Sequence, residues 1–269
     1  MATLVPAAVK VKDGTELNVV ISGPPSDVTV VLLHGWTLDL TSWNKVAESL
    51  PGRVLRYDHR GHGHSGGGTV RTLDQLADDL AEVLETHAPN ENLVLAGHSM
   101  GGMTMMALAE RHPQVYERVQ GAVFVATSPG SLPPVRAMEQ LLGRWLARRT
   151  ALGFARTMPL GLRAMLFGKR ANWKDVAATS KMISRCTGNA FTDFRYELAT
   201  HDRAKALAEL TSIPAAILAG SSDLLTPPRH ARAIATELPQ AELVIYPGAG
   251  HMLPMERATE VAARIKRYL

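Results

Sequence analysis

"VLAGHSMGGMTMMALAE", residues 94–110, joins a strand-like apolar run to a helix-like one across a serine flanked by glycines. Gly97-His98-Ser99-Met100-Gly101 fits the pattern Gly-x-Ser-x-Gly, in which a serine on a strained turn projects its hydroxyl from the end of a strand. Side chains at positions 97 and 101 would strike the neighbouring strand and helix, so glycine is needed at both. The stretch predicts a strand, a sharp turn and a helix, with Ser99 as a candidate nucleophile.

Eight apolar runs predict strands, and helical patterns lie between them. The runs cover residues 7–11, 17–22, 28–33, 53–58, 92–97, 121–127, 214–220 and 242–248. A helix is predicted over 72–87, where one face carries Leu73, Leu76, Leu80 and Leu84, and a last helix is expected over 256–268. Strands and helices alternate through 28–127 and again from 213. The sequence therefore predicts an α/β protein with a doubly wound, mainly parallel sheet.

Residues 129–208 interrupt this alternation. They contain Arg-rich helical stretches and turn signals but no convincing strand, so we expect a helical lid inserted into a core formed by 1–128 and 209–269. The segment holds ten Arg and four Lys against five Asp and Glu, a charge of +9, whereas the whole chain carries +4 and the rest therefore −5. This basic segment is interpreted either as a solvated helical surface or as a face that attracts an anionic substrate, a carrier protein or a lipid surface.

The composition is that of an ordinary globular protein, with 269 residues, 46% hydrophobic and 20% charged, which favours one domain. Cys186 is the single cysteine, so no intrachain disulfide can form, and we expect a buried, inert thiol. Pro6, Lys10 and Lys12 precede any run long enough for a signal peptide, and no apolar tract is long enough for a membrane span, so a cytoplasmic location is expected. Residues 129–208 hold no recognition motif and few aromatics, which disfavours nucleic acid as a partner.

A serine hydroxyl needs a base, and the base needs an orienting acid, to attack a carbonyl at neutral pH. Two downstream segments supply them: "ILAGSSDLLTPP" contains Asp223 just after a predicted strand, and "YPGAGHMLPME" contains His251 just after the last one. The carboxyl ends of parallel strands meet at one edge of a sheet, where the loops of such sheets build sites. The order Ser99, Asp223, His251 therefore predicts a catalytic triad at this edge.

Taken together, these motifs resemble the α/β-hydrolase fold family over essentially the whole chain. The matching segments are "LLHGWTLDLTSW", "YDHRGHGHS", "GHSMGG", "GSSDLLTP" and "GAGHMLPME". The resemblance implies an eight-stranded, mainly parallel sheet, with residues 129–208 as the lid that covers the pocket and selects substrates. It also implies that the backbone N–H groups of Trp36 and Met100 form an oxyanion hole, in which one donor contributes about 3 kcal/mol of transition-state stabilisation in other enzymes.

Other polar residues near the motifs have competing interpretations. His34 precedes the oxyanion turn, and the resemblance favours a structural role in holding that loop over direct catalysis. Asp58 competes with Asp223 as the acid of the triad, but Asp58 precedes the serine and resembles a structural turn aspartate. His98 is expected to pack against the sheet.

A histidine-rich turn and a methionine-rich helix raise two further alternatives. His59, His62 and His64 suggest a metal cluster, but the glycines among and after them favour a tight surface turn, and no metal is predicted. The run "MTMMALA" after the candidate nucleophile is expected to belong to the core rather than to a substrate channel.

A serine nucleophile selects acyl transfer within this family, whose dehalogenases and epoxide hydrolases carry aspartate there. The expected reaction is hydrolysis of a carboxylic ester or thioester through an acyl-enzyme on Ser99, without a cofactor. The alternatives are acyl transfer or acyl elimination by the same triad, and a non-catalytic binding role. The substrate is expected to be a small ester or acyl group, free or carried on an acyl carrier protein or coenzyme A. The protein is expected to be a monomer or a homodimer.

Overall fold

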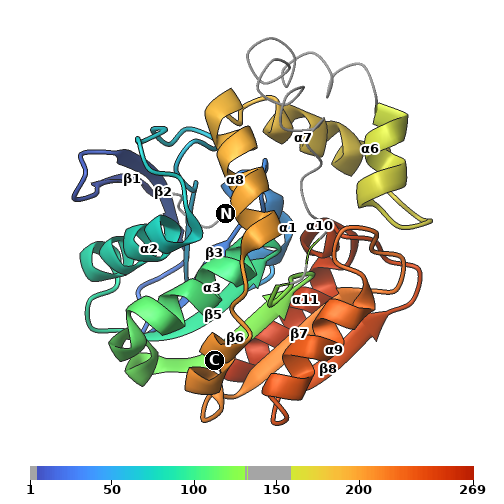
Figure 1. Cartoon of the computed structure of the whole chain (residues 1–269). Coiled ribbons are helices and arrows are strands. Elements are labelled where there is room, and N and C mark those ends of the chain that lie inside the picture. The colour runs from blue at the N-terminus through green and yellow to red at the C-terminus, as the bar shows by residue number, and fades with distance from the viewer. Residues whose placement is uncertain (1–4, 131, 133–158) are drawn as a thin grey trace.

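An eight-stranded sheet lies at the centre of the computed structural model, which describes residues 5–130, 132 and 159–269 (Figure 1). Its strands are β1 (Val5–Lys10), β2 (Glu16–Ser22), β3 (Val28–Leu33), β4 (Arg53–Tyr57), β5 (Asn92–His98), β6 (Val119–Val125), β7 (Ala215–Gly220) and β8 (Glu242–Tyr246). They lie in the order β1-β2-β4-β3-β5-β6-β7-β8, in which β2 is antiparallel to both of its neighbours and all other pairs are parallel. This order confirms the predicted mainly parallel α/β sheet.

Helices cover both faces of the sheet. They are α1 (Asn44–Ala47), α2 (Leu73–His87), α3 (Met100–Arg111), α6 (Pro159–Leu166), α7 (Trp173–Ile183), α8 (Gly188–Thr200), α9 (Pro228–Glu237), α10 (Leu253–Glu256) and α11 (Ala258–Ile265), with short 3-10 helices at Leu40–Trp43, Pro113–Arg118, Lys205–Leu210 and Lys266–Tyr268. The terminal helix predicted over about 256–268 is present as α11 and the 3-10 helix that follows it. Arg257, with a φ of −133° and a guanidinium that donates to the Pro247 carbonyl, separates it from α10.

Side chains alternate between two apolar cores along the central strands, as a strand period of two requires. Val31 and Leu33 of β3 point to the core that contains α2, α3 and α9, whereas Val30 and Leu32 point to the core that contains α1 and α11. All four are fully buried. The sheet is thus covered on both faces, which explains why its central strands are apolar throughout.

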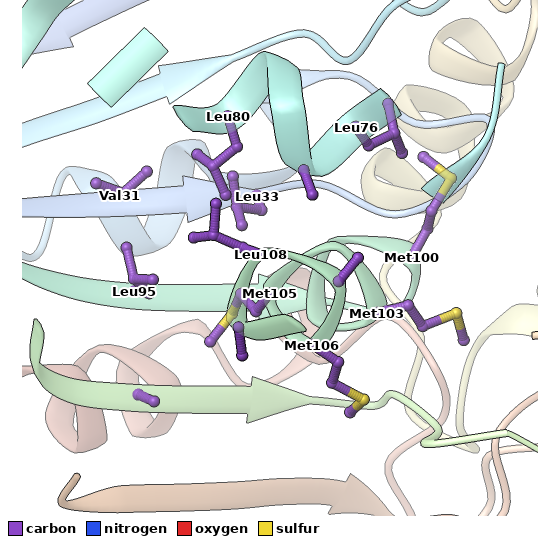
Figure 2. Close-up of a cluster of buried hydrophobic side chains, with 14 of the residues drawn as sticks. Val31, Leu33, Leu76, Leu80, Leu95, Met100, Met103, Met105, Met106 and Leu108 are labelled. Carbon is purple, nitrogen blue, oxygen red and sulfur yellow. The ribbon is translucent and has the colours of Figure 1, made fainter. Parts of the chain in front are cut away.

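Helices α2 and α3 contribute leucine and methionine side chains to one buried cluster (Figure 2). The four leucines expected on one side of α2 have no exposed surface. The methionines of α3 are buried in the same core, which confirms that they are core residues: Met100, Met103, Met105 and Met106. Full burial of one such side chain contributes about 2 kcal/mol, so this contact holds the start of α3 firmly against the sheet.

Helices α6, α7 and α8 lie together at one end of the sheet (Figure 1). The Thr187 N–H donates to the Gly61 carbonyl in the loop after β4 (2.9 Å), and the His251 N–H donates to the Leu166 carbonyl from the loop after β8 (2.8 Å). These helices therefore cover the carboxyl ends of the strands. Helices α6 and α7 share an apolar cluster with the loops below, which consists of Leu38, Leu166, Phe167, Val176, Met182, Ile183, Met252 and Met255.

The lid predicted over 129–208 is described only in part, because residues 131 and 133–158 lie outside the described residues. Among the described residues, no helix is long and apolar enough to cross a membrane.

Candidate active site

Ser99 stands between the end of β5 and the start of α3 in a strained backbone conformation. Its φ is 52° and its ψ −115°, a region that a residue with a side chain rarely enters and that costs about 1–3 kcal/mol. The turn is held by its neighbours, since the Ser99 N–H donates to the Val125 carbonyl (2.9 Å) and the Ser99 carbonyl accepts from the Gly102 N–H (2.9 Å). The strained turn expected from the motif is therefore present at this serine.

The glycines beside Ser99 are required by contacts between backbones. A Cβ atom on Gly97 would lie 2.5 Å from the Gly102 nitrogen in α3, and one on Gly101 would lie 2.4 Å from the Leu33 oxygen in β3. Both distances are far below a normal van der Waals contact. The expected clashes with the helix and the neighbouring strand are therefore confirmed, and α3 can approach the sheet this closely only because these side chains are missing.

Asp223 follows β7 and uses both of its carboxylate oxygens. Oδ1 accepts from the N–H groups of Leu225 (2.8 Å) and Thr226 (2.9 Å), and Oδ2 accepts from His251 Nδ1 (2.8 Å) and Thr226 Oγ1 (2.8 Å). Burial raises the pKa of this carboxyl, but the nearby His251 charge and these hydrogen bonds outweigh burial and lower the pKa of Asp223 to about 2. Asp223 is therefore a carboxylate at neutral pH.

His251 follows β8 and is buried beside Asp223. Because an ionised carboxylate only accepts hydrogen bonds, the 2.8 Å contact assigns the proton to His251 Nδ1. The other ring nitrogen, Nε2, is then the basic one. An imidazole in this tautomer, oriented by a buried carboxylate, is chemically suited to take a proton from a hydroxyl group.

His98 connects the histidine loop to the turn at Ser99. Its Nε2 lies 2.9 Å from the His251 carbonyl, and the two imidazole rings have their centroids 4.9 Å apart. The structure thus brings His251 beside the immediate chain neighbour of Ser99. His98 was expected merely to pack against the sheet, and this hydrogen bond gives it a more specific contact.

The loop after β3 packs against the same turn. A Cβ atom on Gly35 would lie 3.2 Å from the Ser99 Cβ, so the residue directly before Trp36 lies close to Ser99. The Trp36 ring packs against Phe191 of α8, with 4.8 Å between the ring centroids. Met100 is the first residue of α3, where a helix has no earlier turn to accept its N–H. The two candidate oxyanion donors therefore belong to the two segments that meet at Ser99.

His34 and Asp58 hold the loops around this site. His34 Nε2 accepts from the His59 N–H (2.9 Å), which leaves Nδ1 to donate to the Gly35 carbonyl (2.8 Å), and burial lowers the pKa of His34 to about 4. Asp58 accepts from the backbone N–H groups of Leu40 (2.7 Å) and His64 (2.9 Å). Both side chains bind backbone groups, in agreement with the structural roles expected for them.

The histidine-rich turn is tight, as predicted, but its expected surface position is wrong for two residues. Gly61 and Gly63 have φ values of 75° and 54°, whereas His59 and His62 have no exposed surface. The His62 ring packs against Phe194 of α8 at 5.6 Å between centroids. The His59 ring packs against His34 at 4.4 Å between centroids. Within the described parts of the chain, no three His, Cys, Asp or Glu side chains are grouped so that they could hold a metal ion.

Thr226 is a residue of the site that the sequence analysis missed. Its hydroxyl donates to Asp223 Oδ2 at 2.8 Å and lies 3.3 Å from His251 Nδ1. An aspartate in a turn bonds backbone N–H groups that follow it, as Asp223 does with Leu225, but this pattern did not single out the Thr226 side chain.

Comparisons with known proteins identify the family of this chain. The sequence model of the serine aminopeptidase S33 family matches residues 24–258. The pimeloyl-[acyl-carrier protein] methyl ester esterase of Sodalis glossinidius is 31% identical over 236 residues, covering 84% of this chain and 87% of the relative. The dihydrolipoyllysine-residue acetyltransferase component of the acetoin cleaving system of Pseudomonas putida is 30% identical over 92% of this chain, which spans 65% of that relative's length.

The solved structures give the same result. A thermophilic esterase from Thermogutta terrifontis superposes with a TM-score of 0.80 at 27% identity, covering 99% of this chain and 98% of that one. The strand order, the turn at Ser99 and the match over residues 24–258 all agree, so this chain is an enzyme of the α/β-hydrolase fold and belongs to the serine aminopeptidase S33 family.

Proposed function

We propose that this enzyme hydrolyses a carboxylic ester or thioester through an acyl-enzyme on Ser99. The observation that carries the proposal is the buried 2.8 Å hydrogen bond between Asp223 and His251 Nδ1, in the loop that His98 ties to the strained turn at Ser99. This arrangement leaves the imidazole Nε2 as a base. A triad of nucleophile, base and orienting acid is what acyl transfer by a serine requires.

The reaction proceeds in two steps, acylation of Ser99 and hydrolysis of the acyl-enzyme. His251 Nε2 takes the hydroxyl proton as Ser99 Oγ attacks the carbonyl carbon, and the carbonyl oxygen becomes an oxyanion that accepts from the N–H groups of Trp36 and Met100. The imidazolium then protonates the departing alkoxide or thiolate, which leaves as alcohol or thiol. Water attacks the acyl-enzyme by the same route, with His251 as base, and releases the acid and free Ser99.

Residues 129–208 are proposed to form the lid over this site. Its described helices α6–α8 support this, because they contact the loops after β3, β4 and β8. The exposed cations of α7 and the loop before it are Lys169, Arg170, Lys174 and Lys181. The one acid in that stretch, Asp175, is buried and paired with Lys45 at 2.8 Å. This charge favours an anionic substrate, such as an acyl group on an acidic carrier protein or coenzyme A. The Sodalis relative, a pimeloyl-[acyl-carrier protein] methyl ester esterase, agrees with a carrier-bound ester.

Acyl transfer to an alcohol or thiol is the second candidate, because the Pseudomonas putida relative is named an acetyltransferase component. Transfer uses the same acyl-enzyme, and only the attacking group of the second step differs. The two reactions are distinguished by how the acyl-enzyme partitions between water and an added acceptor.

The first experiment tests the nucleophile. A fluorophosphonate probe should add once to the wild-type chain. It should also add once to the matched control Ser49→Ala, which replaces an exposed serine. Intact mass should show no adduct on Ser99→Ala. An adduct that persists on Ser99→Ala, or its absence from a folded wild-type chain, would refute the nucleophile assignment.

The second experiment tests the reaction and the charge of the substrate. Anionic and neutral p-nitrophenyl esters of equal acyl length are compared between low and high salt, with and without an alcohol acceptor. We expect hydrolysis to dominate, and kcat/KM for the anionic ester alone to fall as salt rises. Product that forms mainly on the acceptor would favour acyl transfer, and an equal salt response of both esters would assign the cations to a solvated surface.

A further inference from the structure

Two segments far apart in the sequence, residues 166–169 and 248–252, lie backbone against backbone. A Cβ atom on Gly168 would lie 2.0 Å from the Gly248 oxygen, and one on Gly250 would lie 2.4 Å from the Gly168 nitrogen. The Lys169 N–H donates to the Gly248 carbonyl at 3.2 Å. No side chain fits between them, so a shift of either segment is passed directly to the other. We call this contact the histidine-loop joint.

The joint holds the backbone of His251 from the lid side. The His251 N–H donates to the Leu166 carbonyl at 2.8 Å, while the His251 carbonyl accepts from His98 Nε2 at 2.9 Å. The ring itself is held by Asp223 through Nδ1 at 2.8 Å. Three directional contacts from three different segments therefore fix where the imidazole stands, and one of them comes from Leu166 at the end of α6.

Glu256 is the side chain that closes the joint. Its Oε2 accepts from the Gly168 N–H at 2.8 Å, and its two oxygens lie 3.1 Å and 3.2 Å from the Gly250 nitrogen. One carboxylate thus bridges a donor in each segment, and Gly250 is the residue directly before His251. Hydrogen bonds from N–H groups to a charged acceptor are stronger than those between neutral groups.

We propose that Glu256 is a positioning residue for His251, acting through the histidine-loop joint. This inference rests on the proposed function, in which His251 is the base. Loss of the carboxylate frees the Gly168 and Gly250 N–H groups, so the two segments separate and the imidazole loses its fixed position relative to Ser99. A misplacement of about 1 Å at a reacting group costs on the order of 10²-fold in rate.

Apolar packing alone does not replace this contact. Leu166 and Phe167 are buried with Met252 and Met255 in the cluster beneath α6 and α7, which holds the segments near each other. Such packing is non-directional, however, and leaves freedom to slide, whereas the bridging carboxylate fixes the register of one backbone against the other. Substitution of Glu256 should therefore affect turnover more than folding.

The main variant is Glu256→Gln, which keeps the size but replaces one acceptor oxygen by a donor that faces an N–H group. The matched control is Glu260→Gln, which removes a half-buried acid of α11 paired with Arg257. Gly168→Ala strains the same joint from the lid side through its clash with the Gly248 oxygen. The two joint variants should lower kcat about tenfold or more, with KM changed less than threefold. Their combination should lose less than the product of the single effects, because both break one contact.

A spectroscopic measurement reports on the position of His251 independently of enzyme activity. The proton on His251 Nδ1, held by Asp223, gives a low-field proton resonance that should broaden or shift in Glu256→Gln and stay unchanged in Glu260→Gln. If the fluorophosphonate fails to label Ser99 in the wild-type chain, the proposed function fails while this resonance still tests positioning. An unchanged resonance, together with kcat within twofold of wild type in a folded Glu256→Gln, would overturn the inference.

Discussion

Gly101→Ala tests whether the close approach of α3 to β3 builds the site. The added Cβ would lie 2.4 Å from the Leu33 oxygen and 2.7 Å from the Leu33 carbonyl carbon, both atoms of the strand backbone. Neither can rotate away, so helix and strand must separate by about 1 Å to reach normal contact. Overpacking of this kind costs about 1–3 kcal/mol. The melting temperature should therefore fall by roughly 3–10 °C.

The same separation should damage the chemistry. β3 continues into the loop of Trp36, and α3 begins at Met100, so moving one from the other pulls apart the two proposed oxyanion donors. Loss of one such donor costs about 10²–10³-fold in kcat. We expect Gly101→Ala to lower kcat for a p-nitrophenyl ester by about 100-fold and to slow fluorophosphonate labelling at Ser99 in proportion.

Gly67→Ala is the matched control, because a Cβ atom there meets no atom within 4 Å. It should leave both the melting temperature and kcat at wild-type values. If Gly101→Ala behaves as Gly67→Ala does in thermal unfolding and in labelling rate, the reasoning from backbone contact to site geometry is refuted.

Three further predictions concern charge and burial. The pKa of Asp223, lowered from 3.8 to about 2, means that its ionised form stabilises the fold above about pH 4 and that this stabilisation is lost as pH falls toward 2. In urea unfolding, the free energy of unfolding of wild type should exceed that of Asp223→Asn by about 2 kcal/mol at neutral pH. This difference should shrink as the pH falls from 4 to 2, and a constant difference would contradict the prediction. Asp79→Asn leaves the fully buried guanidinium of Arg60 without its main partner, so unfolding at pH 7 should lose about 3–5 kcal/mol, and a loss below about 1 kcal/mol would disprove the role of this pair. Burial raises the pKa of the Cys186 thiol to about 12, so a thiol reagent at pH 8 should modify the unfolded chain only, and rapid modification of the folded chain would show that the thiol is accessible.

Local patterns predicted the strands because burial on both faces leaves a continuous apolar run. The errors lie at the ends of elements, where tertiary contacts decide which residue is the last one. The strand expected over 121–127 lies at β6, residues 119–125, because Ala126 adopts a φ of 45° that no strand residue has. Ala126 begins the loop after β6, and the run of apolar residues in the sequence does not reveal the backbone conformation of that loop.

The buried turn around His59 and His62 shows a second limit. Histidine and glycine in alternation are typical of an exposed turn, and the turn itself is present. Its burial depends on distant parts of the chain. His59 packs against His34, and His62 packs against Phe194 of α8, which starts more than 120 residues later. The sequence around 59–64 contains no information about which helix will cover it, so only the assembled fold distinguishes a solvated histidine from a buried one.

The candidate site depends on glycines of two kinds, and only one kind was visible in the sequence. Gly97 and Gly101 stand at a fixed spacing from Ser99, so their role follows from a motif. Gly168 and Gly250 act in the same physical way, by letting two backbones meet, but 81 residues separate them and no spacing rule connects them. The motif therefore identified the candidate nucleophile, and the order of Ser99, Asp223 and His251 identified the base. The contact that we propose to hold the base in place is a property of the folded chain. Substituting a glycine of either kind by alanine should impair the same reaction, since each removes a backbone approach on which the site is built.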